Sequence, residues 1–301
     1  MKENARLIYH IIALIVVVIW GSTFVFTKLL LLSGLTAAQV VLLRFLIAYS
    51  MLLGFSLSRK NHRWFSNSLR DELLMVGLGI TGGSVYFLAE NMALTYTTTT
   101  NTSLIVCLCP LFAALLISLF YKSERLRPIQ VAGSLMAAVG VVIVVLNGRF
   151  VLHLSPVGDA LAFTACMCWA LYSLLLIPAN KRYDALFITR KTFFYGILTI
   201  LPYFIYRPEM PPMATLTRPD VLLNILFLGC VASMLCYLTW TWVIEKLGAV
   251  IATNYVYFNP VITIICAWWI LSETITVYFL LGTSLILIGM YLADKHKTPK
   301  I

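Results

Sequence analysis

Three ionisable residues lie inside stretches of sequence that are otherwise apolar, namely Lys28, Arg44 and Glu90. A charge placed in an apolar layer costs several kcal/mol of free energy unless it is paired or reaches water. Counting along the stretches places the three side chains at a similar depth, and Glu90 is the only acid there. Two interpretations stay open: Glu90 binds a cationic group or takes up a proton, or it is a fixed counter-ion for Arg44 or Lys28.

Aromatic, hydroxyl and amide side chains recur at helical spacing in the same stretches. Steps of three residues place Trp20 with Thr23, and Trp169 with Tyr172, on single helix faces. Such a mixture suits a cavity that holds an amphipathic solute and then releases it. For any one of these residues, helix packing or an interfacial aromatic belt is the simpler explanation. The predicted substrate-binding set is Trp20, Thr23, Tyr86, Glu90, Asn91, Trp169, Tyr172, Tyr237, Asn254 and Tyr257.

Two prolines, Pro110 and Pro260, fall near the middle of apolar stretches. A proline there removes a backbone hydrogen bond and can leave carbonyl groups open to a polar ligand or to water. Their joint placement predicts a role as a hinge or as cavity backbone. The alternative is that each proline only bends its helix for packing.

The elements that carry these residues are long apolar runs. The chain has 301 residues, of which 61% are hydrophobic and 11% charged, whereas soluble domains are roughly 45–50% apolar and about 25% charged. A run of roughly 20 apolar residues can cross a hydrocarbon core about 30 Å thick as a helix. Unbroken hydropathy favours helices over a β-barrel. The predicted spans are 7–31, 37–57, 73–96, 102–121, 127–146, 157–178, 187–206, 221–244, 249–271 and 275–293.

The net charge of +10 is distributed unevenly among the connections between these spans. Most Lys and Arg residues lie in alternate connections and at both chain ends, while Lys28, Arg149, Arg207 and Arg218 fall on the other side. The positive-inside rule then predicts that both termini are cytoplasmic. No basic patch is left over for nucleic acid.

Several landmarks recur 149 residues apart. Glu124, Gly133 and Gly140 are matched by Glu273, Gly282 and Gly289, and Trp20 is matched by Trp169. Such self-similarity indicates a duplicated unit. An odd number of spans per unit inverts the second copy, as in many secondary transporters. The predicted fold is an all-α integral membrane protein of ten transmembrane helices, formed by two inverted five-helix repeats, residues 1–148 and 149–301.

Glu124 and Glu273 each follow a serine at the start of a predicted span. Carboxylates are favoured at helix N-termini, so we interpret both as helix caps rather than as reacting groups. The glycines that follow permit close helix contact, either within the fold or in a homodimer.

The sequence offers little for enzymatic chemistry. It contains no phosphate-binding loop, nucleophile elbow or zinc-binding histidine pair, and none of its four histidines lies deep in a span. The seven cysteines fall within spans without companion ligands, which indicates apolar fillers. We therefore expect no enzymatic activity, no cofactor and no metal.

Several short motifs together resemble a known family. These are Trp20-Gly21-Ser22-Thr23-Phe24, Arg44-Phe45, Cys109-Pro110-Leu111, Glu124-Arg125-Leu126, Trp169-Ala170-Leu171-Tyr172-Ser173 and Asn259-Pro260-Val261, with the closing segment from Glu273 to Gly289. In this order they resemble the EamA-type transporters of the drug/metabolite transporter (DMT) superfamily. The resemblance covers nearly the whole chain, as two tandem repeats.

The resemblance implies a multi-pass protein of the bacterial inner membrane that moves amino acids, other small metabolites or drugs, often outward. Two departures from the family pattern, Glu90-Asn91 and the basic pair Arg190-Lys191, favour a zwitterionic or charged metabolite. The leading hypothesis is a secondary transporter, and more specifically an exporter, that works by alternating access through a central cavity. Its expected partners are a small-molecule substrate and the lipid bilayer. Multidrug efflux of amphipathic cations is the alternative, followed by a membrane-embedded enzyme and a non-transporting sensor.

Overall fold

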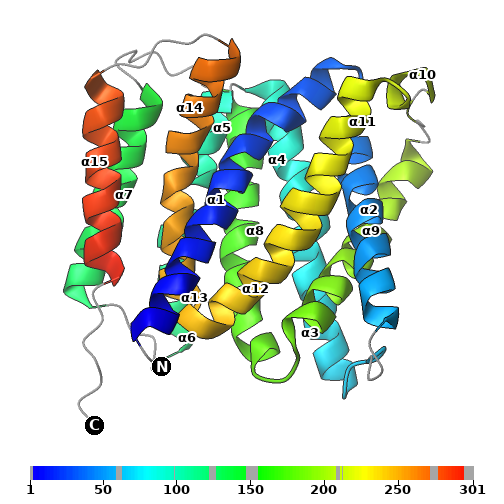
Figure 1. Ribbon diagram of the computed structural model, residues 1–301, viewed down its shortest axis with the longest axis horizontal. Helices are drawn as coiled ribbons and strands as arrows, with labels where there is room; N and C mark the ends of the chain where they lie inside the picture. The colour runs from blue at the N-terminus through cyan, green and yellow to red at the C-terminus, as the bar shows by residue number, and fades with distance from the viewer. Residues whose placement is uncertain are drawn as a thin grey trace.

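Every secondary-structure element that the computed structural model describes is a helix (Figure 1). The described residues are 3–58, 63–97, 99–121, 127–146, 155–207, 211, 213–271 and 277–294. The helices are α1 (Glu3–Leu32), α2 (Ala37–Leu57), α3 (Leu69–Gly79), η1 (Ile80–Ser84), α4 (Val85–Tyr96), α5 (Thr99–Val106), α6 (Cys109–Phe120), α7 (Pro128–Leu146), α8 (Pro156–Asn180), α9 (Ala185–Tyr206), α10 (Met213–Leu216), α11 (Pro219–Leu226), η3 (Phe227–Leu235), α12 (Cys236–Leu247), α13 (Ala249–Asn254), η4 (Tyr255–Phe258), α14 (Asn259–Leu271) and α15 (Val277–Asp294). The predicted all-α class is confirmed.

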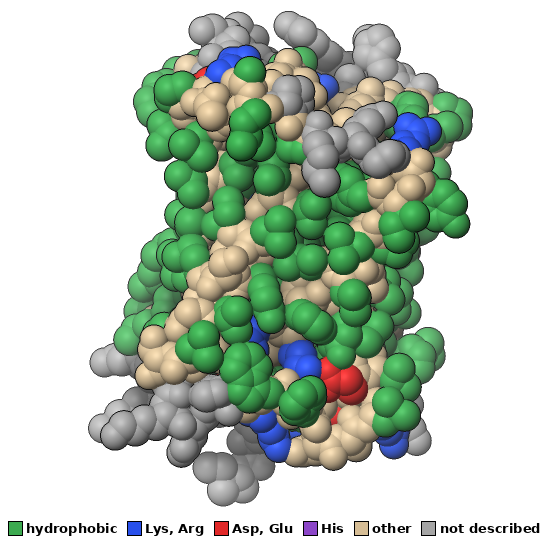
Figure 2. Space-filling model, turned by 90° about the vertical axis from the view of Figure 1, so that its right-hand side faces the viewer, with side chains coloured by type: hydrophobic (Ala, Val, Ile, Leu, Met, Phe, Trp, Pro, Cys, Tyr) green, Lys and Arg blue, Asp and Glu red, His purple; other side chains and the backbone are tan. Residues whose placement is uncertain are grey.

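Within the described residues, six helical segments are long and apolar enough to cross a membrane: Leu7–Leu32, Ala37–Leu57, Leu69–Tyr96, Pro156–Asn180, Pro219–Leu247 and Ala249–Cys266. Cys109–Phe120, Pro128–Ile143 and Leu280–Ala293 are shorter apolar helices. Apolar side chains cover the middle of the surface in Figure 2, while Lys and Arg side chains gather toward its two ends. Such a girdle fits the hydrocarbon layer of a bilayer. The chain is therefore a multi-pass integral membrane protein.

The two segments Leu69–Tyr96 and Pro219–Leu247 are both interrupted by π-helical turns, η1 and η3. Gly83 in η1 has φ −126° and ψ −107°, which lie outside the helical region. π turns loosen the regular hydrogen-bond ladder and are frequent at functional sites. In both turns a backbone carbonyl oxygen accepts a hydrogen bond from a distant side chain. Tyr237 Oη donates to Gly82 O at 2.7 Å, and Trp20 Nε1 donates to Ala232 O at 3.0 Å.

Two further breaks separate α5 from α6 and α13 from α14. Pro110 and Pro260 each lie in the first turn of the helix that follows the break. A proline is well tolerated there, since the first backbone N–H groups of a helix have no intrahelical partner. The two breaks also touch, because the thiol of Cys107 lies 3.7 Å from the carbonyl oxygen of Val256 and donates to it.

Helices α7 and α15 run side by side at one edge of the molecule (Figure 1). A Cβ atom at Gly133 or at Gly289 would come within 2.6 Å of the other glycine's carbonyl oxygen, and one at Gly140 within 2.7 Å of Gly282 O. These glycines therefore permit close helix contact within one chain, which is the first of the two alternatives that the sequence left open for them. The predicted caps Glu124 and Glu273 lie outside the described residues.

Candidate functional site

A small cavity lies at the centre of the helix bundle, where both halves of the chain meet. Its volume is about 30 Å³, room for about two water molecules. Helices α1, α2, α4, α5, α6, α8, α12 and α14 and the 3₁₀ turn η4 contribute to its wall. The lining residues are Trp20, Thr23, Phe24, Arg44, Tyr86, Phe87, Glu90, Val106, Cys109, Trp169, Tyr237, Val256 and Asn259.

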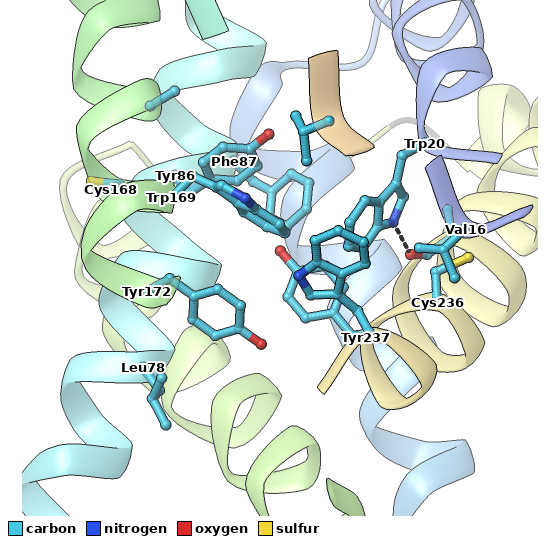
Figure 3. Close-up of a cluster of buried hydrophobic side chains, with 14 of the residues drawn as sticks. Val16, Trp20, Leu78, Tyr86, Phe87, Cys168, Trp169, Tyr172, Cys236 and Tyr237 are labelled. Carbon is cyan, nitrogen blue, oxygen red and sulfur yellow. Dashed lines mark hydrogen bonds between the residues drawn. The ribbon is translucent and has the colours of Figure 1, made fainter. Parts of the chain in front are cut away.

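Aromatic rings close this cavity on several sides (Figure 3). Trp20 meets Trp169 edge to face, with ring centroids 5.2 Å apart, and lies 5.6 Å from Tyr237. The ring of Tyr86 lies 5.3 Å from that of Trp169. These separations fall in the favourable range for aromatic pairs, each worth about 0.5–1.5 kcal/mol beyond area burial. The rings therefore form a closed aromatic cluster across four different helical segments.

The two charged groups of the cavity are held separately. Arg44 Nε donates to Ser233 Oγ at 2.8 Å, and its guanidinium lies 4.0 Å from the centroid of the Phe87 ring. Glu90 Oε1 accepts a hydrogen bond of 2.9 Å from Tyr86 Oη. No ion pair joins Arg44 to Glu90 among those found in the described part of the chain. The cavity thus carries a cation and an anion that share a wall without contacting each other.

Lys28 forms no ion pair with Glu90 among those found in the described residues. Its Nζ donates to the carbonyl oxygen of Leu94 at 2.9 Å, beyond the cavity wall. The direct ion pair that one of the two interpretations assigned to Glu90 is therefore formed with neither Arg44 nor Lys28 in the described part of the chain. The reason is local, since a serine and an aromatic ring hold the guanidinium while a tyrosine holds the carboxylate.

Two polar atoms on lining residues have no hydrogen-bond partner within the described chain, the indole Nε1 of Trp169 and the side-chain Oδ1 of Asn259. Buried polar atoms are normally hydrogen-bonded, so each such exception requires an explanation. Together with Arg44 and Glu90 the wall offers one free donor, one free acceptor, one cation and one anion. This combination suits a small ligand that carries charges of both signs.

The structure brings together six of the ten predicted substrate-binding residues: Trp20, Thr23, Tyr86, Glu90, Trp169 and Tyr237. The other four, Asn91, Tyr172, Asn254 and Tyr257, do not line the cavity. Asn91 Nδ2 donates to Ala37 O at 3.3 Å, and Tyr172 packs behind Trp169 with centroids 5.3 Å apart. Tyr257 belongs to a separate buried cluster with Cys107 and Val141. Asn254 is buried, and its side-chain amide has no partner in the described residues.

Sequence reasoning missed Phe87, Val106, Cys109, Val256 and Asn259 as part of the wall. Pro110 and Pro260 themselves do not line the cavity, but Cys109 and Asn259 directly precede them and do. The repeated prolines were therefore a usable signal for the adjacent residues. The apolar members carry no chemical signature that distinguishes them from other packing residues.

Comparison with known proteins identifies a family. The sequence model of the EamA-like transporter family matches residues 7–146 and 156–293. A protein of Archaeoglobus fulgidus named an uncharacterized transporter is 26% identical over 96% of this chain and 98% of its own length. A protein of Escherichia coli K12 named a probable amino-acid metabolite efflux pump is 24% identical over 94% of this chain and 93% of its own. A solved crystal structure shares the fold, with a TM-score of 0.74, 19% identity and 97% coverage of both chains.

Proposed function

Because the chain belongs to the EamA-like transporter family, we propose that it exports small metabolites, amino acids above all, by alternating access through the central cavity. The family and the relatives are named as transporters rather than as enzymes. Export and the amino-acid class are supported by the name of the Escherichia coli relative. The observation that carries the proposal is the placement of Arg44 and Glu90 on one cavity wall without a direct ion pair.

A zwitterion fits this wall better than an apolar solute does. The guanidinium of Arg44 can bind a carboxylate, and the carboxylate of Glu90 can bind an ammonium group. Trp169 Nε1 and Asn259 Oδ1 add one donor and one acceptor that lack partners in the described chain. A wall of neutral aromatic rings alone would not need two opposite charges, which are costly to bury.

The small cavity volume corresponds to an occluded state in this proposal. A cavity of about 30 Å³ cannot contain an amino acid, so substrate entry requires that the aromatic rings move apart. Trp20 and Trp169 are the natural gate, because their edge-to-face contact joins the first half of the chain to the second. Movement of one half of the chain against the other would separate the two rings and open the cavity to one side of the membrane and then to the other.

In this proposal the transporter has ten transmembrane spans, formed by two inverted five-helix repeats, residues 1–148 and 149–301. Contacts between equivalent positions support this arrangement. Trp20 touches Trp169 and Cys107 touches Val256, and both pairs are 149 residues apart. The contact of Gly133 with Gly289 is likewise mirrored by that of Gly140 with Gly282. Reciprocal contacts of this kind are what a two-fold axis between the repeats produces.

The proposed topology has both termini in the cytoplasm of a bacterium and the bundle in its inner membrane. The Lys and Arg bias among the connections supports this orientation. Helix α1 begins and α15 ends at the same end of the molecule (Figure 1), as an even number of crossings requires.

The experiment that tests the proposal is flux in liposomes that contain the purified full-length protein. A panel of labelled amino acids is loaded inside, and efflux is compared with that from empty vesicles. Saturable efflux of at least one amino acid, lost in an Arg44→Gln protein and retained in a Lys246→Gln protein, is the expected result. Flux equal to that of empty vesicles across the whole panel contradicts the proposal.

Efflux of amphipathic cations is the second candidate, since the aromatic cluster around Glu90 could hold a cation by cation–π contact. This function would need Glu90 but not Arg44. Efflux of a lipophilic cationic dye that survives Arg44→Gln and is lost in Glu90→Gln would favour it over amino-acid export.

A further inference from the structure

A second and larger cavity opens on the side of the bundle, between α2, α3, α9 and the segment before α3. Its volume is about 550 Å³. We call it the lateral groove, and its lining residues are Tyr49, Trp64, Phe65, Ser66, Ser68, Leu69, Glu72, Arg190, Lys191, Phe194 and Tyr195. Figure 2 looks onto this side of the molecule and shows Lys, Arg and acidic side chains gathered at its lower end, below an apolar surface. The groove thus lies where a membrane interface would meet the protein.

The charges of the lateral groove do not balance. The carboxylate of Glu72 is bound by Lys191 Nζ, by Tyr195 Oη and by the backbone N–H of Ser66. Arg190, which is also buried, belongs to none of the ion pairs found among the described residues. One cation is therefore in excess.

Two carboxylates at the starts of α3 and α9 already have partners of their own. Asp71 forms its ion pair with Arg182 and accepts a hydrogen bond from Tyr183. Asp184 caps the start of α9, since its Oδ1 accepts from Phe187 N at 2.8 Å. Neither carboxylate forms an ion pair with Arg190 among the described residues, so its guanidinium remains available to an anionic ligand.

Arg190 also has donors to spare. A guanidinium carries five N–H donors, and the described chain supplies acceptors at Ser56 Oγ and at the carbonyl oxygen of Arg63. The ring of Trp64 lies 4.9 Å from its central carbon and holds the group from one side. A planar guanidinium with free donors is suited to two-point recognition of a phosphate.

The rim of the lateral groove is strongly apolar. Phe65 is 79% exposed and Leu69 is 77% exposed, and Trp64 and Phe194 are also exposed. A dissolved inorganic anion would make no contact with these apolar side chains. A molecule with an anionic head and apolar chains would bind the cation and also cover the apolar rim. Basic pockets between transmembrane helices, edged by interfacial aromatic residues, fit the headgroups of anionic lipids.

We propose that the lateral groove binds one anionic phospholipid, with its phosphate at Arg190 and Lys191 and its chains against Phe65, Leu69 and Phe194. The proposal requires only that the chain spans a membrane, and it holds whatever the central cavity transports. A bound lipid would join α2, α3 and α9 at one end of the bundle.

The test uses the purified full-length protein in a neutral detergent. Native mass spectrometry and thermal unfolding are recorded with phosphatidylglycerol, with zwitterionic phosphatidylethanolamine and with inorganic phosphate. We expect phosphatidylglycerol alone to be retained and to raise the unfolding temperature. Equal retention of the zwitterionic lipid overturns the charge argument, and equal protection by inorganic phosphate overturns the assignment to a lipid.

Two variants of opposite sign sharpen the test. Arg190→Gln should weaken phosphatidylglycerol retention about five- to tenfold, the size expected for one interfacial charge. Glu72→Gln releases Lys191 from its partner and should strengthen retention by a similar factor. Lys246→Gln, which removes a partly exposed cation paired with Glu245, is the matched control and should change nothing.

If Arg190→Gln does not fold, Glu72→Gln and the lipid comparison on the unmodified protein decide the outcome. Unchanged retention in a folded Arg190→Gln protein, or weakened retention in Glu72→Gln, contradicts the proposal.

Discussion

The central cavity and the lateral groove each combine basic and acidic side chains with aromatic rings, but they arrange the charges in opposite ways. In the cavity Arg44 and Glu90 are held by separate neutral partners. In the groove Glu72 is bound directly by Lys191, and Arg190 is the excess cation. Paired charges stabilise the contact between helices, whereas charges held apart leave both groups ready for the two ends of a ligand. The paired charges of the groove therefore predict a structural role for Glu72 and Lys191, and the separated charges of the cavity predict a transport role for Arg44 and Glu90.

The largest effect is expected at Arg44. Replacement by Gln removes the cation that would bind the substrate carboxylate, and charge-assisted hydrogen bonds contribute about 1.5–3 kcal/mol each. We expect amino-acid efflux to fall by about a hundredfold or more, measured as initial rate in liposomes at matched protein content. Efflux within twofold of the unmodified protein would show that Arg44 has only a structural role.

Glu90→Gln is expected to reduce efflux by at least about tenfold, since an amide binds an ammonium group more weakly than a carboxylate does. The pH response should change as well. Acidification protonates a carboxylate and so lowers efflux by the unmodified protein, whereas the residual efflux of Glu90→Gln cannot respond in this way. Rates recorded across a pH series check both effects, and a variant with full rates and an unchanged profile would remove Glu90 from the site.

Trp169→Phe keeps an aromatic ring and removes the free indole donor. A neutral hydrogen bond contributes about 0.5–1.5 kcal/mol, so we expect a two- to tenfold rise in the substrate concentration for half-maximal efflux. Trp20→Phe is the informative partner, because the donor of Trp20 is already used by Ala232 O. That variant should lose stability more than affinity. Equal effects of the two changes on affinity would count against a substrate contact by Trp169.

The smallest effect on transport is expected in the lateral groove. Glu72→Gln breaks the pair with Lys191 and should lower stability by about 1 kcal/mol, because the carboxylate is partly exposed and water screens the pair. Unfolding temperature in lipid-free detergent measures this loss. Efflux per folded molecule should stay within twofold. A tenfold loss of efflux would contradict the assignment of a structural role to the groove and a transport role to the cavity.

The sequence predicted the helical class, the membrane and the family because these depend on composition, long apolar runs and the order of motifs. It also placed Trp20, Tyr86, Glu90, Trp169 and Tyr237 in one site, since helical spacing and intramembrane charge are readable along the chain. Both signals are local, and each concerns a single helix.

The sequence could not predict which neighbours hold Arg44 and Glu90. The partner of Arg44 is Ser233, 189 residues away, and is brought close by the bundle. The Gly82-Gly83 pair was a usable signal for the break at η1, whereas η3, which frees Ala232 O, contains a single glycine and has no comparable pattern. Tyr257 and Asn254 were placed at the cavity by counting helix faces. The 3₁₀ turn η4 separates α13 from α14 and changes the residue spacing there, and Val256 and Asn259 line the wall instead.

The most direct test of the account compares three forms of one transported amino acid: the zwitterion, its amide, which lacks the carboxylate, and its N-acetyl form, which lacks the ammonium group. The unmodified protein should prefer the zwitterion. Arg44→Gln should shift the preference toward the amide, and Glu90→Gln toward the N-acetyl form. If the three forms are exported equally, or if both variants lose all three alike, the two charges do not read the two ends of the substrate and the account is contradicted.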